Sequence, residues 1–255
     1  MAGNFAPKSG KRTRNIYDPK SSEPFKLSRS KLDLFLGCPR CFYLDRRRGV
    51  GRPGMPPFNL NINVDTLLKK EFDIHRAKAQ AHPLMKEYGI EAVPFAHEKM
   101  DEWRENFKGV QYLHEPTNLL ITGAVDDIWV NPKGELYVVD YKATGNKEKA
   151  VTALDQDWHI GYKRQMEIYQ WLLRRNGHSV SDTGYFVYCT GRSDTEAFDG
   201  KLEFEVVVIS YIGKDDWIED CIAGAHACLV GEEIPTSGES CEYCAYTGAV
   251  QHELN

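Results

Sequence analysis

The chain has 255 residues, of which 42% are apolar and 27% charged, and its net charge at pH 7 is −5. This length allows a substantial core, and the composition is ordinary for a soluble globular protein. No apolar run approaches the length of a membrane span, and the N-terminus lacks the apolar stretch of a signal peptide, so we expect a cytoplasmic protein without a membrane partner. The net charge excludes a general electrostatic affinity for nucleic acid, which would have to come from local patches.

Residues 1–24 are polar and show no hydrophobic periodicity. We predict a disordered, mildly basic tail there, followed by a single domain over residues 25–255. A short helix is expected after Ser28, because serine is a favoured N-cap, and this helix ends at the sequence C-P-R-C. The next predicted helix covers residues 61–78, and its apolar stripe consists of Val64, Leu67, Leu68 and Phe72.

Residues 119–144 predict two apolar strands joined by the turn N-P-K-G. A three-residue loop with its glycine in the left-handed conformation is a common hairpin connection, and it would pair Asp126 with Asp140. Because side chains alternate between the faces of a strand, Asp126, Asp140 and Lys142 then share one face. Asp127 falls on the other face. A two-residue loop would shift the register by one and remove Asp126 from this site.

Two carboxylates and an ammonium on one face of an apolar hairpin are unfavourable unless something compensates them. A divalent cation bound by both carboxylates would do so, since Mg²⁺ commonly takes one or two carboxylates together with water and substrate phosphate. Lys142 would then act on a water molecule or stabilise charge that develops on a phosphate. The alternative is a structural Asp–Lys pair at a sheet edge. The complete arrangement of two acids, turn and D-Y-K sequence favours the metal site.

A helix is predicted over residues 160–176, and on it Gln165 and Tyr169 are four residues apart and share a face. Strong apolar patterns also predict elements on either side of the hairpin. These are a helix over residues 101–107, strands over 109–115, 183–190 and 202–210, and a helix over 215–230.

The seven cysteines are interpreted as metal ligands or buried thiols and not as a disulfide framework. Two C-x-x-C pairs lie near opposite ends of the sequence, and together they predict one four-thiolate site that joins the chain ends. From spacing alone, tetrahedral Zn²⁺ is the default metal. The ligands would be Cys38, Cys41, Cys241 and Cys244, whereas packing roles are assigned to Cys189, Cys221 and Cys228.

The sequences G-A-V-D at residues 123–126 and V-V-D-Y-K-A-T at residues 138–144 resemble the core of the PD-(D/E)XK nuclease superfamily, specifically its RecB-like exonuclease branch. The resemblance extends to Q-M-E-I-Y at residues 165–169, which matches the Q-x-x-x-Y motif of that branch, and to the terminal cysteines. It implies an α/β fold with a restriction-endonuclease-like core, in which helices flank a mixed central sheet and a cysteine-rich metal staple joins the two ends.

The resemblance also implies roles for single residues. Asp126 and Asp140 would bind Mg²⁺ or Mn²⁺ with the carbonyl of Tyr141, and Lys142 would serve the attacking water. Asp65 would be a further metal ligand, because it stands where RecB-like relatives carry a metal-binding histidine. The alternative for Asp65 is an acid placed favourably at the start of a helix dipole.

Gln165 and Tyr169 would border the site and bind DNA. Relatives such as AddB and the CRISPR adaptation exonucleases hold a [4Fe–4S] cluster with one early and three late cysteines. This chain has two early and two late cysteines, with Val250 about where the third late cysteine would fall, so Cys41 would complete the set. The resemblance therefore implies an iron–sulfur cluster, and Zn²⁺ stays open as the alternative.

The implied function is a metal-dependent DNA nuclease, an exonuclease on single strands or duplex ends, that hydrolyses phosphodiesters in DNA repair, recombination or defence. Its partners would be DNA and other proteins of such a pathway. One alternative is a catalytically silent DNA-binding or complex-forming module that retains the nuclease fold. Another is a metal-stapled interaction domain with structural hairpin acids. The intact set of two acids and a lysine counts against the silent module, because buried charges are costly to retain without a use.

Overall fold

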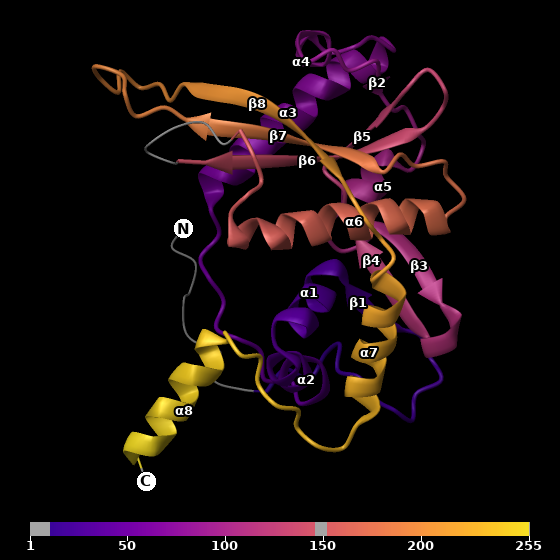
Figure 1. The fold of residues 1–255 in the computed structure, drawn as a ribbon, viewed down its shortest axis with the longest axis vertical. Helices are drawn as coiled ribbons and strands as arrows, with labels where there is room; N and C mark the ends of the chain where they lie inside the picture. Colours follow the sequence, from indigo (N-terminus) through magenta and orange to yellow (C-terminus); the bar gives the residue numbers. More distant parts are fainter. Residues whose placement is uncertain (1–10, 146–151, 255) are drawn as a thin grey trace. The chain divides into compact units, whose positions relative to one another are not determined.

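The computed structural model describes residues 11–145 and 152–254, and within them the chain divides into two compact units (Figure 1). We expected a single domain over residues 25–255. The described residues instead form two units, and each unit consists of segments that are distant in the sequence. No helix in these described ranges is long and apolar enough to cross a membrane. Unit 1 takes in residues 11–55, 113–120 and 219–254, and unit 2 takes in residues 56–112, 121–145 and 152–218.

Unit 2 is built on a five-stranded sheet with the strand order β2-β5-β6-β7-β8. Strands β6 and β7 are parallel, whereas the other neighbouring pairs are antiparallel, so the sheet is mixed. The predicted α/β fold class is confirmed. The elements of unit 2 are α3 (Asn59–Ala77), α4 (Pro83–Glu87), β2 (Val93–Pro94), α5 (Met100–Arg104), β5 (Asp127–Val130), β6 (Leu136–Thr144), a 3-10 turn (Asp157–His159), α6 (Ile160–Arg175), β7 (Thr183–Gly191) and β8 (Phe204–Ile212).

Strands β5 and β6 form the predicted hairpin, but its first strand is shorter than predicted, because residues 119–123 form a separate strand, β4 (Leu119–Gly123), in the three-stranded sheet. Gly134 in the turn has φ of +82°, which is the left-handed conformation that the three-residue loop requires. Asp127 pairs with Val139, so the residue before β5, Asp126, lies opposite Asp140. The predicted register is therefore confirmed.

Helices α3 and α6 both pack on β6 (Figure 1). An apolar cluster that includes Phe72 of α3, Trp129 and Tyr141 fills one side of the sheet, and the rings of Phe72 and Trp129 stack with centroids 5.4 Å apart. On the other side, Asp140 accepts a hydrogen bond from Gln165 of α6. The alternation of side chains along β6 thus separates an apolar layer from a polar site.

Helix α3 begins at Asn59, two residues before the predicted start. Leu68 and Phe72 are buried as predicted, but Leu67 is 63% exposed, so its assignment to the apolar stripe was wrong. Residues four apart lie on the same side of a helix, and Leu67 is turned by about 100° from Leu68. It therefore faces away from the core.

Unit 1 holds α1, with Ser28 as its N-cap, although the serine side chain makes no capping hydrogen bond. A three-stranded sheet has the order β1-β4-β3, and the residues of β3 and β4 are shared between the two units. The remaining elements are β1 (Phe25–Ser28), α1 (Arg29–Gly37), α2 (Pro39–Arg47), β3 (Val110–His114), a 3-10 turn (Glu115–Thr117), β4 (Leu119–Gly123), α7 (Ile218–Val230) and α8 (Glu242–Leu254).

Residues 11–24 pack within unit 1, so the prediction of a disordered tail is wrong for this part. Arg12 Nη1 lies 3.0 Å from the carboxylate of buried Asp45, and the Tyr17 N–H donates to a backbone carbonyl of α2 at 2.8 Å. The polar composition of this segment indicated disorder. Composition does not reveal the contact between Arg12 and Asp45, because the two residues are distant in sequence. The rest of the predicted tail, residues 1–10, lies outside the described residues.

Gly123, at the end of β4, allows Tyr169 to approach closely, since an added Cβ would lie 2.6 Å from the tyrosine ring and 3.0 Å from Leu172. We expect Gly123→Ala to lower the free energy of unfolding by roughly 1–3 kcal/mol, because the ring must move within a packed core. Urea unfolding measures this change. Gly54→Ala is the control, because its Cβ would meet nothing within 4 Å. Equal stability of Gly123→Ala and the parent would contradict the packing described.

Candidate active site and metal centre

Asp140, in the middle of β6, is fully buried. Its Oδ1 accepts a hydrogen bond from Gln165 Nε2 at 2.7 Å. Its Oδ2 forms an ion pair with Lys142 but has no properly oriented hydrogen-bond donor among the described residues. Buried carboxylate oxygens normally have such partners. The Lys142 ammonium therefore compensates this oxygen, and a divalent ion at Asp140 would bind beside the ion pair.

Lys142 projects from the same face of β6 as Asp140. Its side chain is only 14% exposed, which is more buried than a lysine at an open strand end. The Lys142 ammonium lies 4.5 Å from the centroid of the Tyr162 ring, which α6 supplies. The ring and the Asp140 carboxylate together hold the ammonium at the site.

Asp126 enters the site from the position just before β5, the other strand of the hairpin. Its Oδ2 accepts a hydrogen bond from the Tyr141 N–H at 3.0 Å, and its Oδ1 lies 3.1 Å from Lys69 Nζ. The same ammonium lies 2.9 Å from Asp65 Oδ2, one helical turn away on α3. Lys69 thus bridges two acids that the sequence analysis assigns to the metal.

The charged groups of the site change one another's pKa values. Burial raises the pKa of Asp140 to about 7, and the Asp126 carboxylate acts in the same direction. Burial also opposes ionisation of Asp126, but the ammonium groups of Lys69 and Lys142 outweigh it and hold the pKa of Asp126 below its usual value. Burial opposes protonation of both lysines, yet the neighbouring carboxylates raise their pKa values. When fully ionised, the three carboxylates, counting Asp65, outnumber the two ammonium groups, and burial raises the pKa of Asp65 as well.

Asp65, Asp126 and Lys142 border a cavity of about 370 Å³, whereas the fully buried Asp140 does not line it. Carboxylate oxygens are the ligands that Mg²⁺ and Mn²⁺ prefer, so the donor set fits such an ion. Among the described residues, however, the acids do not bring their oxygens within 4.8 Å of one another as a set of three, and Lys69 lies between Asp65 and Asp126. Asp126 lies opposite Asp140 across the hairpin, and Asp65 is joined to Asp126 through Lys69.

Asp127 points away from this site and is fully buried on the opposite side of the hairpin, as the register predicts. The Tyr141 hydroxyl donates to its Oδ2 at 2.7 Å, and Arg104 Nη2 lies 3.0 Å from its Oδ1, which also pairs with Arg76. Arg104 Nε donates in addition to the carbonyl of Asp126 at 3.0 Å. This network compensates a buried charge and holds the backbone that carries Asp126.

Gln165 and Tyr169 lie beneath the protein surface, with 9% and 3% of their area exposed. Gln165 Nε2 donates to Asp140 and lies 3.1 Å from the Tyr169 hydroxyl. The Tyr169 ring packs against Gly123. In this arrangement the two residues orient the carboxylate of Asp140.

The two C-x-x-C pairs converge within unit 1, as predicted. All four sulfurs lie within 4.8 Å of one another, and such a group can hold a metal ion. Cys41 Sγ lies 3.6 Å from both Cys241 Sγ and Cys244 Sγ, and Cys38 Sγ lies 3.7 Å from Cys244 Sγ. Cys38, Cys41 and Cys241 are buried.

Polar groups favour the metal-binding thiolate form at Cys38, whereas burial raises the pKa of Cys41 and raises that of Cys244 to about 12. Burial opposes ionisation of Cys38, but the N–H groups of Gly238 and Cys41 donate to its sulfur and lower the pKa of Cys38 to about 6. Arg52 Nη2 donates to Cys241 Sγ at 3.2 Å, and its guanidinium lies over the Tyr243 ring at 4.7 Å.

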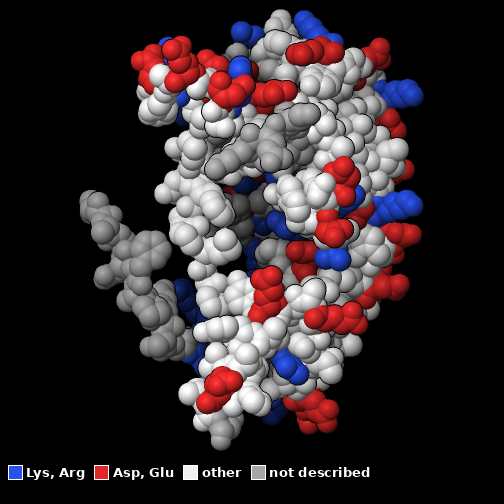
Figure 2. Space-filling view, turned by 60° about the vertical axis from the view of Figure 1, so that its left-hand side comes forward, with Lys and Arg blue, Asp and Glu red and all other residues white. Residues whose placement is uncertain are grey.

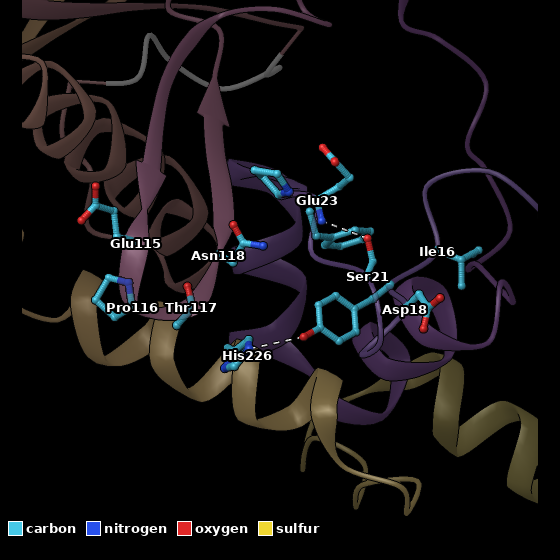
Figure 3. A pocket seen from close by; sticks show the side chains of 12 residues that line it. Ile16, Asp18, Ser21, Glu23, Glu115, Pro116, Thr117, Asn118 and His226 are labelled. Carbon is cyan, nitrogen blue, oxygen red and sulfur yellow. Dashed lines mark hydrogen bonds between the residues drawn. The ribbon is translucent and has the colours of Figure 1, made fainter.

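A second cavity, of about 450 Å³, lies within unit 1 (Figure 3). The hydroxyl of Tyr17 lies 3.3 Å from His226 Nε2 at its edge. Its lining contains Asp18, Glu23 and Glu115 and no lysine or arginine. This cavity is therefore unsuited to a phosphate, and the cavity at Lys142 is the candidate for phosphodiester chemistry.

The sequence analysis missed four residues of these two sites. The i,i+4 spacing of Lys69 from Asp65 could have identified Lys69, because such pairs meet on a helix. No local signal identifies the others, because their partners are distant in sequence. They are Tyr162 beside Lys142, Arg104 beside Asp127 and Arg52 beside Cys241.

Residues 62–249 match the PD-(D/E)XK nuclease superfamily, which is well over half of the chain, and the chain therefore belongs to this superfamily. Membership implies phosphodiester hydrolase activity. A search of curated proteins found no match.

Two solved structures are also similar to the chain. One is a proposed exonuclease from Eubacterium rectale, with a TM-score of 0.40, 15% identity and coverage of 87% of each chain. The other is SSO0001, with a TM-score of 0.41, 16% identity and coverage of 89% of this chain and 86% of that one. These similarities are too distant to support an argument about function.

The cysteine geometry predicts that Cys241→Ser loses bound metal and stability. A metal held by thiolates from two distant segments stabilises the fold, because the unfolded chain does not bring them together. We expect a loss of at least about 2 kcal/mol in the free energy of unfolding. Elemental analysis and thermal unfolding measure the two effects.

Cys228→Ser is the matched control, because this half-buried cysteine lies outside the four-sulfur group. It should retain both metal and stability. Full metal content in the Cys241→Ser variant would contradict the assignment of Cys241 as a ligand.

Proposed function

We propose that this chain is a Mg²⁺- or Mn²⁺-dependent deoxyribonuclease of the RecB-like branch, with exonuclease activity on single strands or duplex ends. The observation that carries the proposal is the pair of Asp126 and Lys142 in the lining of a cavity, with Lys142 bound to the buried Asp140, in a chain of the nuclease superfamily. DNA repair, recombination or defence would supply its DNA substrates and protein partners.

In the proposed mechanism, Asp126 and Asp140 hold the divalent ion, with Asp65 and the Tyr141 carbonyl as further candidate ligands. The ion would polarise a water molecule and a phosphate oxygen. Lys142 orients the attacking water and stabilises the negative charge that develops on the phosphate.

Gln165 and Tyr169 position Asp140 in this proposal and do not contact the strand. Their burial and the Gln165–Asp140 hydrogen bond support this change from the expected DNA-binding role. Hydrogen bonds of this kind commonly fix the orientation of metal-binding carboxylates.

We also propose that the four cysteines hold a single Zn²⁺ ion. Tetrahedral Zn–S bonds of about 2.3 Å place the sulfurs roughly 3.8 Å apart, and three sulfur pairs are separated by 3.6–3.7 Å. In a [4Fe–4S] cluster each cysteine binds a different iron, which holds the sulfurs farther apart. The spacing therefore favours zinc over the cluster implied by the resemblance. Colourless, zinc-containing protein from anaerobic purification would support this proposal, and brown, iron-containing protein would overturn it.

The nuclease proposal is tested by incubating the purified protein with circular and linear DNA, single- and double-stranded, with Mg²⁺ or Mn²⁺. Cleavage of linear DNA that requires a divalent ion and releases short products from the ends would support an exonuclease. Binding without cleavage of any substrate would favour the silent DNA-binding module.

Lys142→Ala should reduce cleavage of end-labelled DNA by at least about a hundredfold, because the ammonium lies where charge develops in the reaction. The variant should remain folded by circular dichroism and retain most DNA binding. Lys133→Ala, in the exposed hairpin turn, is the control and should cleave like the parent. Parental turnover by Lys142→Ala would show that this lysine is not catalytic.

Lys69→Met should bind Mn²⁺ on the order of tenfold more tightly than the parent, because the ion no longer competes with an internal ammonium for Asp65 and Asp126. Without metal, the two carboxylates lose their bridge, and we expect a Tm lower by roughly 2–4 °C, equivalent to about 1 kcal/mol. Calorimetric titration and thermal unfolding measure these changes.

The neighbouring Lys70 is exposed, so Lys70→Met serves as the matched control and should change neither quantity. Weaker Mn²⁺ binding by Lys69→Met would mean that the lysine supports the ion site and does not compete with it.

A further inference from the structure

We propose that the cavity beside Lys142 binds an unpaired nucleotide, and that Phe58 and Trp158 are the aromatic surfaces on which bases of single-stranded DNA stack. This inference rests on the proposed nuclease function and specifies its substrate class. It assigns a binding role to two residues outside the nuclease motifs.

The lining of the cavity is the first observation. Asp65, Asp126 and Lys142 give it one polar side, whereas Phe58, Ile62 and Tyr162 give it an apolar side. A phosphate and its cation need only the polar side. The apolar side suits the flat, weakly polar face of a base, for which aromatic rings are the usual protein partner.

The exposure of the surrounding aromatic residues is the second observation. Phe58, the N-cap residue of α3, is 63% exposed, and Trp158, in the turn before α6, is 55% exposed. Single exposed apolar residues are common on proteins. Here, however, further exposed residues follow each of them, namely Leu60 and Ile62 on α3 and Ile160 on α6.

Trp158 is connected to the reactive groups through Tyr162. The Trp158 and Tyr162 rings meet edge to face with centroids 5.6 Å apart. The Lys142 ammonium lies over the Tyr162 ring, 4.5 Å from its centroid. A short aromatic path therefore leads from the ammonium to the exposed indole. A strand with a phosphate at Lys142 has its neighbouring base within reach of these rings.

The charge of the chain supports stacking as a main source of affinity. The net charge is −5, and Figure 2 shows acidic and basic side chains interspersed over the face in view. Phosphate contacts alone require concentrated positive charge. Stacking does not, but it requires bases whose faces are free, and in a duplex both faces are covered by neighbouring base pairs. The geometry therefore selects single strands.

The test measures binding by fluorescence anisotropy without added divalent cations, so that cleavage does not interfere. The probes are a labelled thymidine oligonucleotide, the same backbone without bases, and a duplex of equal length. The proteins are the parent, Phe58→Ala, Trp158→Ala and Trp158→Phe. Phe107→Ala is the control, since Phe107 is 85% exposed and does not line the cavity.

We expect the parent to bind the thymidine strand about tenfold more tightly than the base-free strand. Phe58→Ala and Trp158→Ala should each weaken thymidine binding by about five- to tenfold without affecting the base-free strand, and Trp158→Phe should restore most of the loss. Phe107→Ala should bind like the parent.

Equal binding of the two strands by the parent, or equal losses on both probes in the two alanine variants, would overturn the stacking proposal. Tighter binding of the duplex would overturn it as well. Neither result bears on the nuclease assignment, because that assignment is decided by metal-dependent cleavage and by Lys142→Ala.

Discussion

The site depends on one constraint: the negative charge of carboxylates at one hairpin must be compensated by nearby positive charge. Asp140 is fully buried, Asp126 lies opposite it, and Lys142 and Lys69 supply the positive charge that keeps this arrangement tolerable. Two ammonium groups do not neutralise three ionised carboxylates, and burial raises the pKa of Asp140 to about 7. Buried carboxylates that lie close together are costly unless cations compensate their charge. The same imbalance that burdens the metal-free fold therefore favours a divalent cation.

The adjacent residues Asp126 and Asp127 lie in different environments, because successive side chains of an extended chain point to opposite faces. Asp126 belongs to the polar site, whereas Asp127 is enclosed by Arg76, Arg104 and the Tyr141 hydroxyl. Arg104 connects the two environments through the Asp126 carbonyl. The network on one face thus supports the backbone that carries the Asp126 carboxylate on the other face.

The hairpin could be predicted in detail because its information is local. The turn glycine set the register, and the register determined which acid joined Asp140. The fold class and the convergence of the cysteines followed from motifs at characteristic spacing. The contacts that complete each site depend on tertiary packing: no local pattern places Arg52 at Cys241 or Tyr162 beneath Lys142. For the same reason composition misjudged residues 11–24, where Arg12 meets Asp45 only in the fold.

The central claim is that the buried pair of acids makes the site a metal-dependent nuclease. Asp140→Asn tests it most directly, because the amide keeps the shape of the side chain but removes the charge that binds a cation. The measurement is cleavage of end-labelled single-stranded DNA in Mn²⁺, together with calorimetric titration of the ion. We predict cleavage by the parent, and for Asp140→Asn a folded protein with no detectable cleavage and at least about tenfold weaker Mn²⁺ binding. Parental cleavage and ion binding by Asp140→Asn would contradict the account.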